Sequence, residues 1–93
     1  MIQSFADDTT RKVWARQRVA RVGPDVQRMA QRKLRQLNAA ERLEDLRLPP
    51  GNRLEKLYAD RAGHYSIRVN DQFRICFRWT RAGPEDVELV DYH

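Results

Sequence analysis

Apolar residues in the first half of the chain recur at helical spacing. They stand three or four positions apart, at Val26, Met29, Ala30, Leu34 and Leu37. This spacing predicts a helix over residues 24–37, because such positions share one face of an α-helix. Pro24 suits its first position, where no backbone N–H donor is needed. The helix is expected to bury its apolar stripe and to leave Arg28, Arg32 and Arg35 in water.

A strand and a helix are predicted before this long helix. Residues 2–5 alternate between apolar and polar side chains, which predicts a first strand. Asp7 or Asp8 stands where a carboxylate can accept a hydrogen bond from the first turn of a helix. That helix is predicted to run through Val13 and Trp14.

A short helix is predicted after the long one. Asn38 and Glu41 have the three-residue spacing of a capping box, in which side chains satisfy the free N–H groups of a helix start. Leu43 and Leu46 would pack this helix against the core, and the Pro-Pro-Gly at residues 49–51 would end it.

After residue 51 the pattern changes from helical to alternating. Turn residues separate four alternating runs, which predict strands at residues 53–57, 64–70, 73–80 and 86–90. The connections are short, so consecutive strands are expected to be antiparallel. The predicted fold class is α+β, with two main N-terminal helices packed on a small antiparallel sheet.

The alternation also assigns side chains to the two faces of the sheet. Residues such as Ile67, Ile75 and Phe77 would face the helices, because successive side chains in a strand point to opposite faces. The opposite face is expected to be open and to carry Arg68, Arg74 and Arg78. Arginines on adjacent strands without interleaved carboxylates repel one another, so this face suggests a polyanionic partner.

Length and composition exclude several classes of protein. With 93 residues and 11.0 kDa the chain is expected to form one domain, residues 1–93, which excludes separate substrate and cofactor domains. It has neither an apolar run of ~20 residues nor a signal-peptide pattern, so the expected compartment is the cytoplasm, with no membrane partner. Cys76 is the single cysteine, and with His64 and His93 it supplies too few ligands for structural zinc.

Positive charge is concentrated in the predicted helices. Nine basic residues and one acidic residue, Asp25, lie between Arg11 and Arg35, and 15 of the 18 cations in the chain are arginine. Arginine binds phosphate through a planar fork of N–H donors, which favours a nucleic-acid partner. An ordinary solvated helix face explains the same charge equally well, so charge alone leaves both interpretations open.

Three stretches carry a family resemblance: residues 49–55 (PPGNRLE), 60–77 (DRAGHYSIRVNDQFRICF) and 87–93 (VELVDYH). They resemble the HigB toxins of the RelE/ParE superfamily, the toxins of type II toxin–antitoxin modules. The resemblance extends over the whole chain from residue 2. It implies a RelE-like fold and a cofactor-free, metal-independent endoribonuclease that cleaves mRNA on the translating ribosome. It also implies a HigA-like helix-turn-helix antitoxin as partner, and contact with operator DNA only through that antitoxin complex.

The same resemblance implies catalytic roles for Arg74, Tyr92 and His93. Arg74 would hold the charge that develops on the phosphate, His93 would take or give a proton, and Tyr92 would stack on a base or bind a phosphate. Simpler roles remain open: a surface ion pair of Arg74 with Glu88 or Asp91, packing of Tyr92, and a frayed chain end at His93. The resemblance favours the catalytic roles, and we expect Arg74→Ala to abolish growth arrest and to leave the fold intact.

The chain departs from the family pattern in its first hairpin. Some HigB toxins have a catalytic histidine and lysine there, at positions that Glu55 and Tyr58 occupy in this chain. Glu55 is a possible base, although a carboxylate also repels the scissile phosphate. Other residues could bind RNA instead, namely Arg53, Arg61, His64, Arg68 and Asn70. The departure predicts a weaker or differently arranged nuclease.

Partners and competing functions follow from the same patterns. On the ribosome, the arginine-rich helices could lie against rRNA phosphates while the sheet face meets mRNA. The alternative is a non-enzymatic toxin of the ParE type, which inhibits a target such as DNA gyrase by binding. A DNA-binding module is disfavoured, because no helix-turn-helix pattern with a recognition helix is present.

Overall fold

The computed structural model of the protein describes residues 1–92. Its regular elements are α1 (Asp8–Trp14), α2 (Pro24–Ala39), β1 (Glu55–Lys56), β2 (His64–Arg68), β3 (Phe73–Thr80) and β4 (Gly83–Asp91). Three short 3₁₀ helices complete the list: η1 (Leu43–Arg47), η2 (Pro50–Asn52) and η3 (Ala59–Arg61). The four strands form one sheet in the order β1-β2-β3-β4, with every pair antiparallel. The predicted α+β architecture is confirmed.

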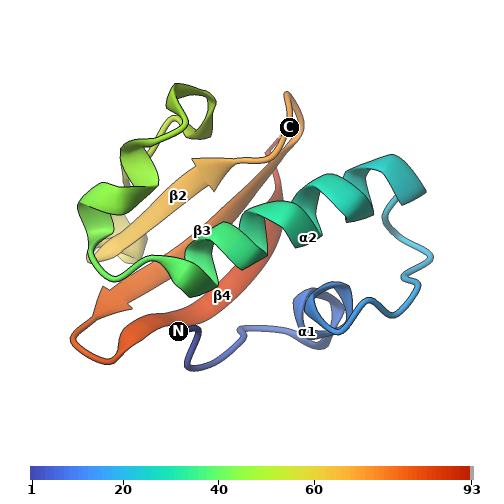
Figure 1. Ribbon diagram of the computed structural model, residues 1–93, viewed down its shortest axis with the longest axis horizontal. Helices are drawn as coiled ribbons and strands as arrows, with labels where there is room; N and C mark the ends of the chain where they lie inside the picture. The colour runs from blue at the N-terminus through green and yellow to red at the C-terminus, as the bar shows by residue number, and fades with distance from the viewer. Residues whose placement is uncertain (93) are drawn as a thin grey trace.

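Both predicted main helices are present. Asp7 caps α1 by accepting a 2.8 Å hydrogen bond from the backbone N of Thr10. α2 begins at Pro24, as predicted, and continues two residues past the predicted end, to Ala39. Its arginines at positions 28, 32 and 35 are exposed, as the apolar periodicity indicated. In Figure 1, α2 crosses one face of the sheet and α1 lies beside β4. Within residues 1–92, no helix is both long and apolar enough to cross a membrane.

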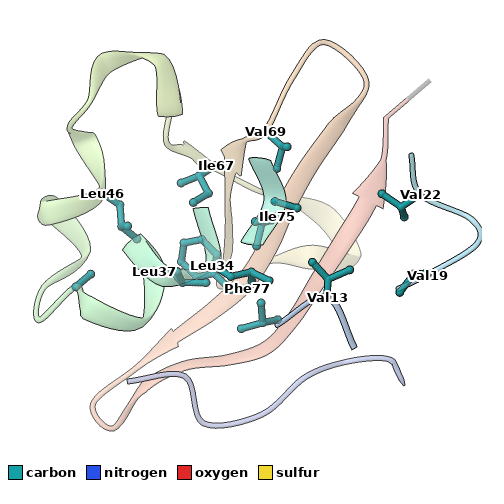
Figure 2. Close-up of a cluster of buried hydrophobic side chains, with 13 residues drawn as sticks. Val13, Val19, Val22, Leu34, Leu37, Leu46, Ile67, Val69, Ile75 and Phe77 are labelled. Carbon is teal, nitrogen blue, oxygen red and sulfur yellow. The ribbon is translucent and has the colours of Figure 1, made fainter. Parts of the chain in front are cut away.

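The hydrophobic core lies between α2 and one face of the sheet. Leu34 and Leu37 of α2 are fully buried against Ile67, Ile75 and Phe77 of the sheet (Figure 2). The predicted division of the sheet into an apolar face and a polar face is therefore correct. Burial of several large aliphatic and aromatic side chains, each worth roughly 1.5–3 kcal/mol, fixes the position of α2 on this face.

The first predicted strand is absent, although its backbone does pair with the sheet. The backbone N of Ala6 donates to the carbonyl of Val87, and the backbone N of Val87 donates to the carbonyl of Ser4, at 2.9 and 3.1 Å. Phe5 makes only an isolated parallel bridge with Val87. The segment is too short for a continuous ladder, but it covers the outer edge of β4.

The predicted capping box after α2 is also wrong. Asn38 belongs to α2, and its side-chain oxygen accepts a 2.9 Å hydrogen bond from the backbone N of Ile2. The short helix η1 is capped instead by Asp45, whose carboxylate accepts 3.0 Å bonds from the backbone N atoms of Glu41 and Arg42. A partner distant in sequence thus replaced the local contact that the spacing suggested.

The strand boundaries match the prediction only for β3. β1 and β2 are shorter than predicted, while β4 begins three residues earlier, at Gly83. The register places Cys76 opposite Glu88 but Arg78 opposite Glu85, so β4 contains one extra residue between these pairs. Asp86 lies in this bulge with a left-handed φ of 52°, a conformation that Asp tolerates better than most residues.

Candidate active site on the far face of the sheet

The face of the sheet opposite α2, here called the far face, carries Glu55, Ser66, Cys76 and Glu88 in one row. The strand register aligns these four residues across β1, β2, β3 and β4. Ser66 and Cys76 are 0% exposed. The expectation of an open face is therefore wrong at its centre, because side chains from the rim cover these two residues.

Arg74 is the most firmly held side chain of this face. Its Nε donates a 2.8 Å hydrogen bond to Oγ of Ser66, and its Nη2 donates a 2.6 Å bond to the backbone carbonyl of Arg53. Nη1 lies 3.9 Å from Oε1 of Glu55, and the Arg74 side chain is only 11% exposed. The carboxylate next to Arg74 is thus Glu55, and the alternative of an ion pair with Glu88 is wrong, because Glu88 pairs with Arg61. Arg74 is a largely buried residue with a fixed guanidinium rather than an exposed one.

The backbone around Arg53 explains how its carbonyl reaches Arg74. Arg53 ends η2 in a left-handed conformation, with φ 45° and ψ 58°. The preceding residue, Asn52, is fully buried and donates to the carbonyls of Leu46 and Leu48 at 3.2 Å each. These contacts hold the segment before β1 in place. The Arg53 side chain itself is exposed, so its contribution to the site is the backbone oxygen.

Tyr92 lies over the centre of the far face. Its hydroxyl oxygen is 3.8 Å from Sγ of Cys76, and its backbone N donates a 2.6 Å bond to the carbonyl of Gln72. Tyr92 is 44% exposed as a residue, so a ligand can reach it. Arg61 approaches the same place from η3, where its Nη2 lies 3.1 Å from Oε1 of Glu88. Tyr92, Arg61 and Arg74 therefore belong to one cluster around Cys76.

Burial sets the protonation of this cluster. Desolvation, and then the neighbouring Cys76, raise the pKa of Tyr92, while the charges of Arg61 and Arg74 oppose the shift. Desolvation likewise raises the pKa of the Cys76 thiol, and the hydrogen bond from Tyr92 and the charge of Arg61 oppose it. At neutral pH the phenol is protonated and available as a hydrogen-bond donor, and the thiol is a neutral packing group.

The remaining arginines of the far face are neutralised by carboxylates. Arg78 donates a 2.6 Å bond to Glu85, and its Nε lies 3.6 Å from Asp86 in the β4 bulge. Arg68 bonds to Asp71 in the β2–β3 turn. The expected row of uncompensated arginines is therefore wrong, because the bulge and the turn supply carboxylates that the alternation could not reveal.

The predicted RNA-binding residues Asn70 and His64 have different surroundings. Oδ1 of Asn70 accepts hydrogen bonds from the backbone N atoms of Gln72 and Phe73 at 2.9 and 2.7 Å, so it shapes the β2–β3 turn. Nδ1 of His64 is buried and has no hydrogen-bond partner among residues 1–92. Tyr58, in the hairpin that departs from the family pattern, is 74% exposed. His93, predicted as a proton carrier, lies outside the described residues.

A second charged surface is a groove of about 450 Å³ between α2 and the segment after α1. It contains the predicted helix arginines, but the sequence did not indicate its groove shape. Five arginines line it, at positions 16, 18, 28, 32 and 35, and the described lining contains no Asp or Glu. Arg18 builds the wall by donating to the Val22 carbonyl at 2.8 Å and to Oε1 of Gln27 at 3.1 Å. We call this the α2 groove.

The α2 groove differs from the far face in its charge balance. Arg28 pairs with Asp25, but the ion pairs within residues 1–92 include none for Arg16, Arg32 or Arg35. Arg28, Arg32 and Arg35 are also close neighbours on one helix face, where like charges destabilise the helix. The α2 groove thus brings together three arginines that have no ion pair among the described residues. Among the same residues, no three His, Cys, Asp or Glu side chains come together in a group that could hold a metal ion.

Comparison with known proteins identifies the family. A profile of RelE-like toxins of the type II toxin–antitoxin system HigB matches residues 3–93. The chain belongs to this family of HigB-like toxins. The resemblance inferred from residues 49–55, 60–77 and 87–93 is thereby confirmed.

Individual relatives of this HigB-like toxin match shorter segments. Toxin HigB-1 of Vibrio cholerae serotype O1 is 54% identical over 48 residues, which cover 52% of this chain and 50% of that protein. An uncharacterized protein of Haemophilus influenzae is 37% identical over 60 residues, covering 64% of this chain and 59% of that protein. The matched segments thus span about half the length of these relatives.

The fold of the HigB-like toxin matches a solved structure over its whole length. The YoeB–YefM complex from Staphylococcus aureus contains a chain that superposes with a TM-score of 0.64. The match covers 100% of this chain and 98% of that one, at 13% sequence identity. At this identity the likeness shows the fold alone, and it confirms the predicted RelE-like fold.

Proposed function

We propose that this HigB-like toxin is an endoribonuclease that cleaves mRNA on the translating ribosome and so arrests growth. The observation that carries the proposal is the cluster of Arg74, Arg61 and Tyr92 on the far face. It brings two guanidinium groups and a neutral phenol to one place, and membership of the HigB-like family supports an assignment to RNA. Arg74 is held rigidly, as a group that stabilises transition-state charge must be.

The proposed reaction is an internal transesterification of RNA. The 2′-oxygen forms a bond to the adjacent phosphorus and its proton goes to a base. The bond between phosphorus and the 5′-oxygen breaks, and the leaving oxygen keeps the electron pair and takes a proton from an acid. The products are a 2′,3′-cyclic phosphate and a 5′-hydroxyl. Arg74 and Tyr92 would donate hydrogen bonds to the phosphate oxygens, whose negative charge grows in the transition state.

Two residues are proposed for proton transfer. Glu55 is exposed at the rim of the site, 3.9 Å from Nη1 of Arg74, where a carboxylate can accept the 2′-OH proton. His93 follows Tyr92 directly and would supply the proton to the leaving oxygen. The proximity of Glu55 to Arg74 also lowers the positive potential of the site, which favours a weaker nuclease than one with cations in the first hairpin.

The proposed protein partner is a HigA-like antitoxin with a helix-turn-helix domain. The family is defined by toxin–antitoxin systems, and the structural neighbour is a complex of YoeB with YefM. Contact with operator DNA would pass through the antitoxin. The α2 groove is proposed to bind rRNA phosphates, because its arginines 16, 32 and 35 have no carboxylate partner among the described residues.

The experiment that tests the function is mapping of mRNA 5′-ends after brief induction of the wild-type toxin, of Arg74→Lys and of a His93 deletion. New ends inside translated codons, absent in both variants, are expected. Arg78→Lys is the matched control, since Arg78 is paired with Glu85 on the same face. Growth arrest without new mRNA ends would contradict the proposal and indicate a binding inhibitor of the ParE type, for which DNA supercoiling is the next assay.

A further inference from the structure

Arg61 reaches across the sheet to its ion-pair partner. It belongs to η3, in the connection between β1 and β2, whereas Glu88 lies on β4 at the other side of the sheet. The 3.1 Å contact between Nη2 of Arg61 and Oε1 of Glu88 therefore crosses β2 and β3. Because Glu88 is the register partner of Cys76, the guanidinium is held next to the centre of the far face.

The charge of Arg61 acts on the candidate catalytic group Tyr92. Burial lowers the pKa of Arg61, but the hydrogen bond and charge of Glu88, with smaller contributions from Cys76 and Tyr92, together raise the pKa, so the guanidinium stays charged. Arg61 and Arg74 are the two arginines whose charges oppose the raised pKa of Tyr92. The two guanidinium groups thus act on the same phenol from different elements, η3 and β3.

The other cations proposed to replace the missing family residues are placed elsewhere. Arg53 contributes its backbone carbonyl and exposes its side chain, and Arg68 bonds to Asp71 in the β2–β3 turn. His64 is the register partner of Arg78, and its Nδ1 is buried. Arg61 is therefore the candidate whose charge reaches the cluster around Tyr92.

We infer that Arg61 is a second phosphate-binding arginine of the active site, and that Glu88 is the positioning residue that holds it there. This inference rests on the proposed nuclease function. A guanidinium has five N–H donors, and the bond to Glu88 uses one of them, so donors remain for a phosphate. Arg61 thus supplies the second positive charge that the Glu55 and Tyr58 positions do not.

The role of Glu88 follows from the geometry of the loop. η3 has no buried residue, and Ala59 within it adopts a left-handed φ of 59°, so the local sequence does little to fix Arg61. The ion pair with Glu88 is the cross-sheet contact that the structure gives this side chain. An arginine that is already oriented loses less rotamer freedom when the phosphate binds.

The test compares this ion pair with a matched pair on the same face. Arg78 and Glu85 form a similar contact, with side chains 46% and 29% exposed against 41% and 29% for Arg61 and Glu88. Two readouts are used: single-turnover cleavage of ribosome-bound mRNA, and affinity for an uncleavable RNA with a 2′-deoxy sugar at the scissile position. Melting temperatures of all variants report folding.

Arg61→Gln is expected to lower the cleavage rate by about 100-fold, as removal of one transition-state donor does in other enzymes. Arg61→Lys is expected to recover only part of the rate, because lysine keeps the charge and lacks the fork. Glu88→Ala should lower the rate with little change in RNA affinity. Glu88→Gln keeps the acceptor oxygen and should restore most of the cleavage rate that Glu88→Ala loses. A merely structural contribution of Glu88 would not explain this restoration.

The controls separate this inference from the proposed function. Arg78→Gln and Glu85→Gln should cleave RNA at close to the wild-type rate. Equal behaviour of folded Arg61→Gln and Arg78→Gln in both assays would overturn the inference. If the wild-type toxin leaves mRNA intact, the nuclease function fails, and affinity for the uncleavable RNA then tests the phosphate site on its own. A loss of affinity in Arg61→Gln alone supports a phosphate site at Arg61. Equal affinity of Arg61→Gln and Arg78→Gln rejects that site. If Arg61→Gln does not fold, Arg61→Lys takes its place.

Discussion

Nε of Arg74 donates a 2.8 Å hydrogen bond to the hydroxyl oxygen of Ser66, a residue that is fully buried on the far face of the sheet. Ser66 lies on β2, next to the strand that carries Arg74. Nη2 of Arg74 also lies 3.4 Å from the Ser66 backbone carbonyl. One residue thus contacts the guanidinium through both its side chain and its backbone, which orients the guanidinium plane.

Ser66→Ala is expected to reduce both stability and activity. Loss of the buried hydroxyl leaves Nε of Arg74 without that acceptor, and removal of one hydrogen bond typically lowers the free energy of unfolding by about 1 kcal/mol. Cleavage should fall further than stability, because the guanidinium loses its orientation. Denaturant titration and mRNA cleavage measure the two effects. Ser4→Ala is the control, since its Oγ accepts a 2.9 Å bond from the backbone N of Asp86, away from the site. Full cleavage by Ser66→Ala would contradict this role.

Substitution of Arg74 itself should affect the fold as well as the activity. Arg74→Ala would leave the buried Ser66 hydroxyl without this donor, and an unsatisfied buried polar group costs about 1–3 kcal/mol. The expectation of an intact fold, made for an exposed arginine, therefore needs correction. Arg74→Lys keeps the charge and fills more of the space than alanine would, so this variant should fold. It should still lose most cleavage activity, because lysine lacks the guanidinium fork. Circular-dichroism melts with mapping of mRNA ends check both points. A folded Arg74→Ala variant that remains fully toxic would remove Arg74 from the site.

Elements with strong periodicity could be predicted from the sequence. β3 and the start of α2 were correct because many apolar side chains in each share one buried face, so local pattern and tertiary packing agree. The capping box at Asn38 and Glu41 failed for the opposite reason. A contact between Asn38 and Ile2, 36 residues away in sequence, replaced the local one.

Alternation placed Arg74 and Cys76 on the correct face, but it could not reveal their partners. The carbonyl of Arg53 reaches Arg74 because the backbone turns left-handed at that residue, and no side-chain pattern indicates such a turn at an arginine. The pairing of Arg61 with Glu88 depends on the path of a loop over two strands. Charge balance at a site is therefore a property of the tertiary structure.

The phenol of Tyr92 should titrate above the usual tyrosine pKa of about 10. Burial, and then Cys76, raise its pKa in the folded state. In the unfolded chain the proton leaves near pH ~10, so above that pH the unfolded state binds fewer protons than the folded state. This group therefore contributes stability below the unfolded pKa, and the contribution is lost as pH rises through the folded pKa. The difference in phenolate absorbance between wild type and Tyr92→Phe measures the folded pKa.

A control in denaturant completes the titration of Tyr92. Unfolding removes both the burial and the contact with Cys76, so the transition should return to the usual value of about 10. Arg61→Gln removes a charge that opposes the shift and should move the folded transition further upward. A folded-state midpoint at or below the denatured one would show that Tyr92 is not buried against Cys76 in solution.

The α2 groove should control ribosome affinity in a salt-dependent manner. A triple variant with Arg16, Arg32 and Arg35 changed to Gln removes three cations that have no carboxylate partner among the described residues. Each phosphate contact contributes about 0.7–0.9 to the slope of log affinity against log salt, so the slope should fall by about 2.

The control variant replaces Arg11, Lys12 and Arg42. It removes the same amount of charge, but from residues already paired with Asp8 or Asp45. Its slope should change little, because those cations are compensated. Equal slopes for the two triple variants, measured by ribosome co-sedimentation over a salt series, would show that total charge rather than the groove determines binding.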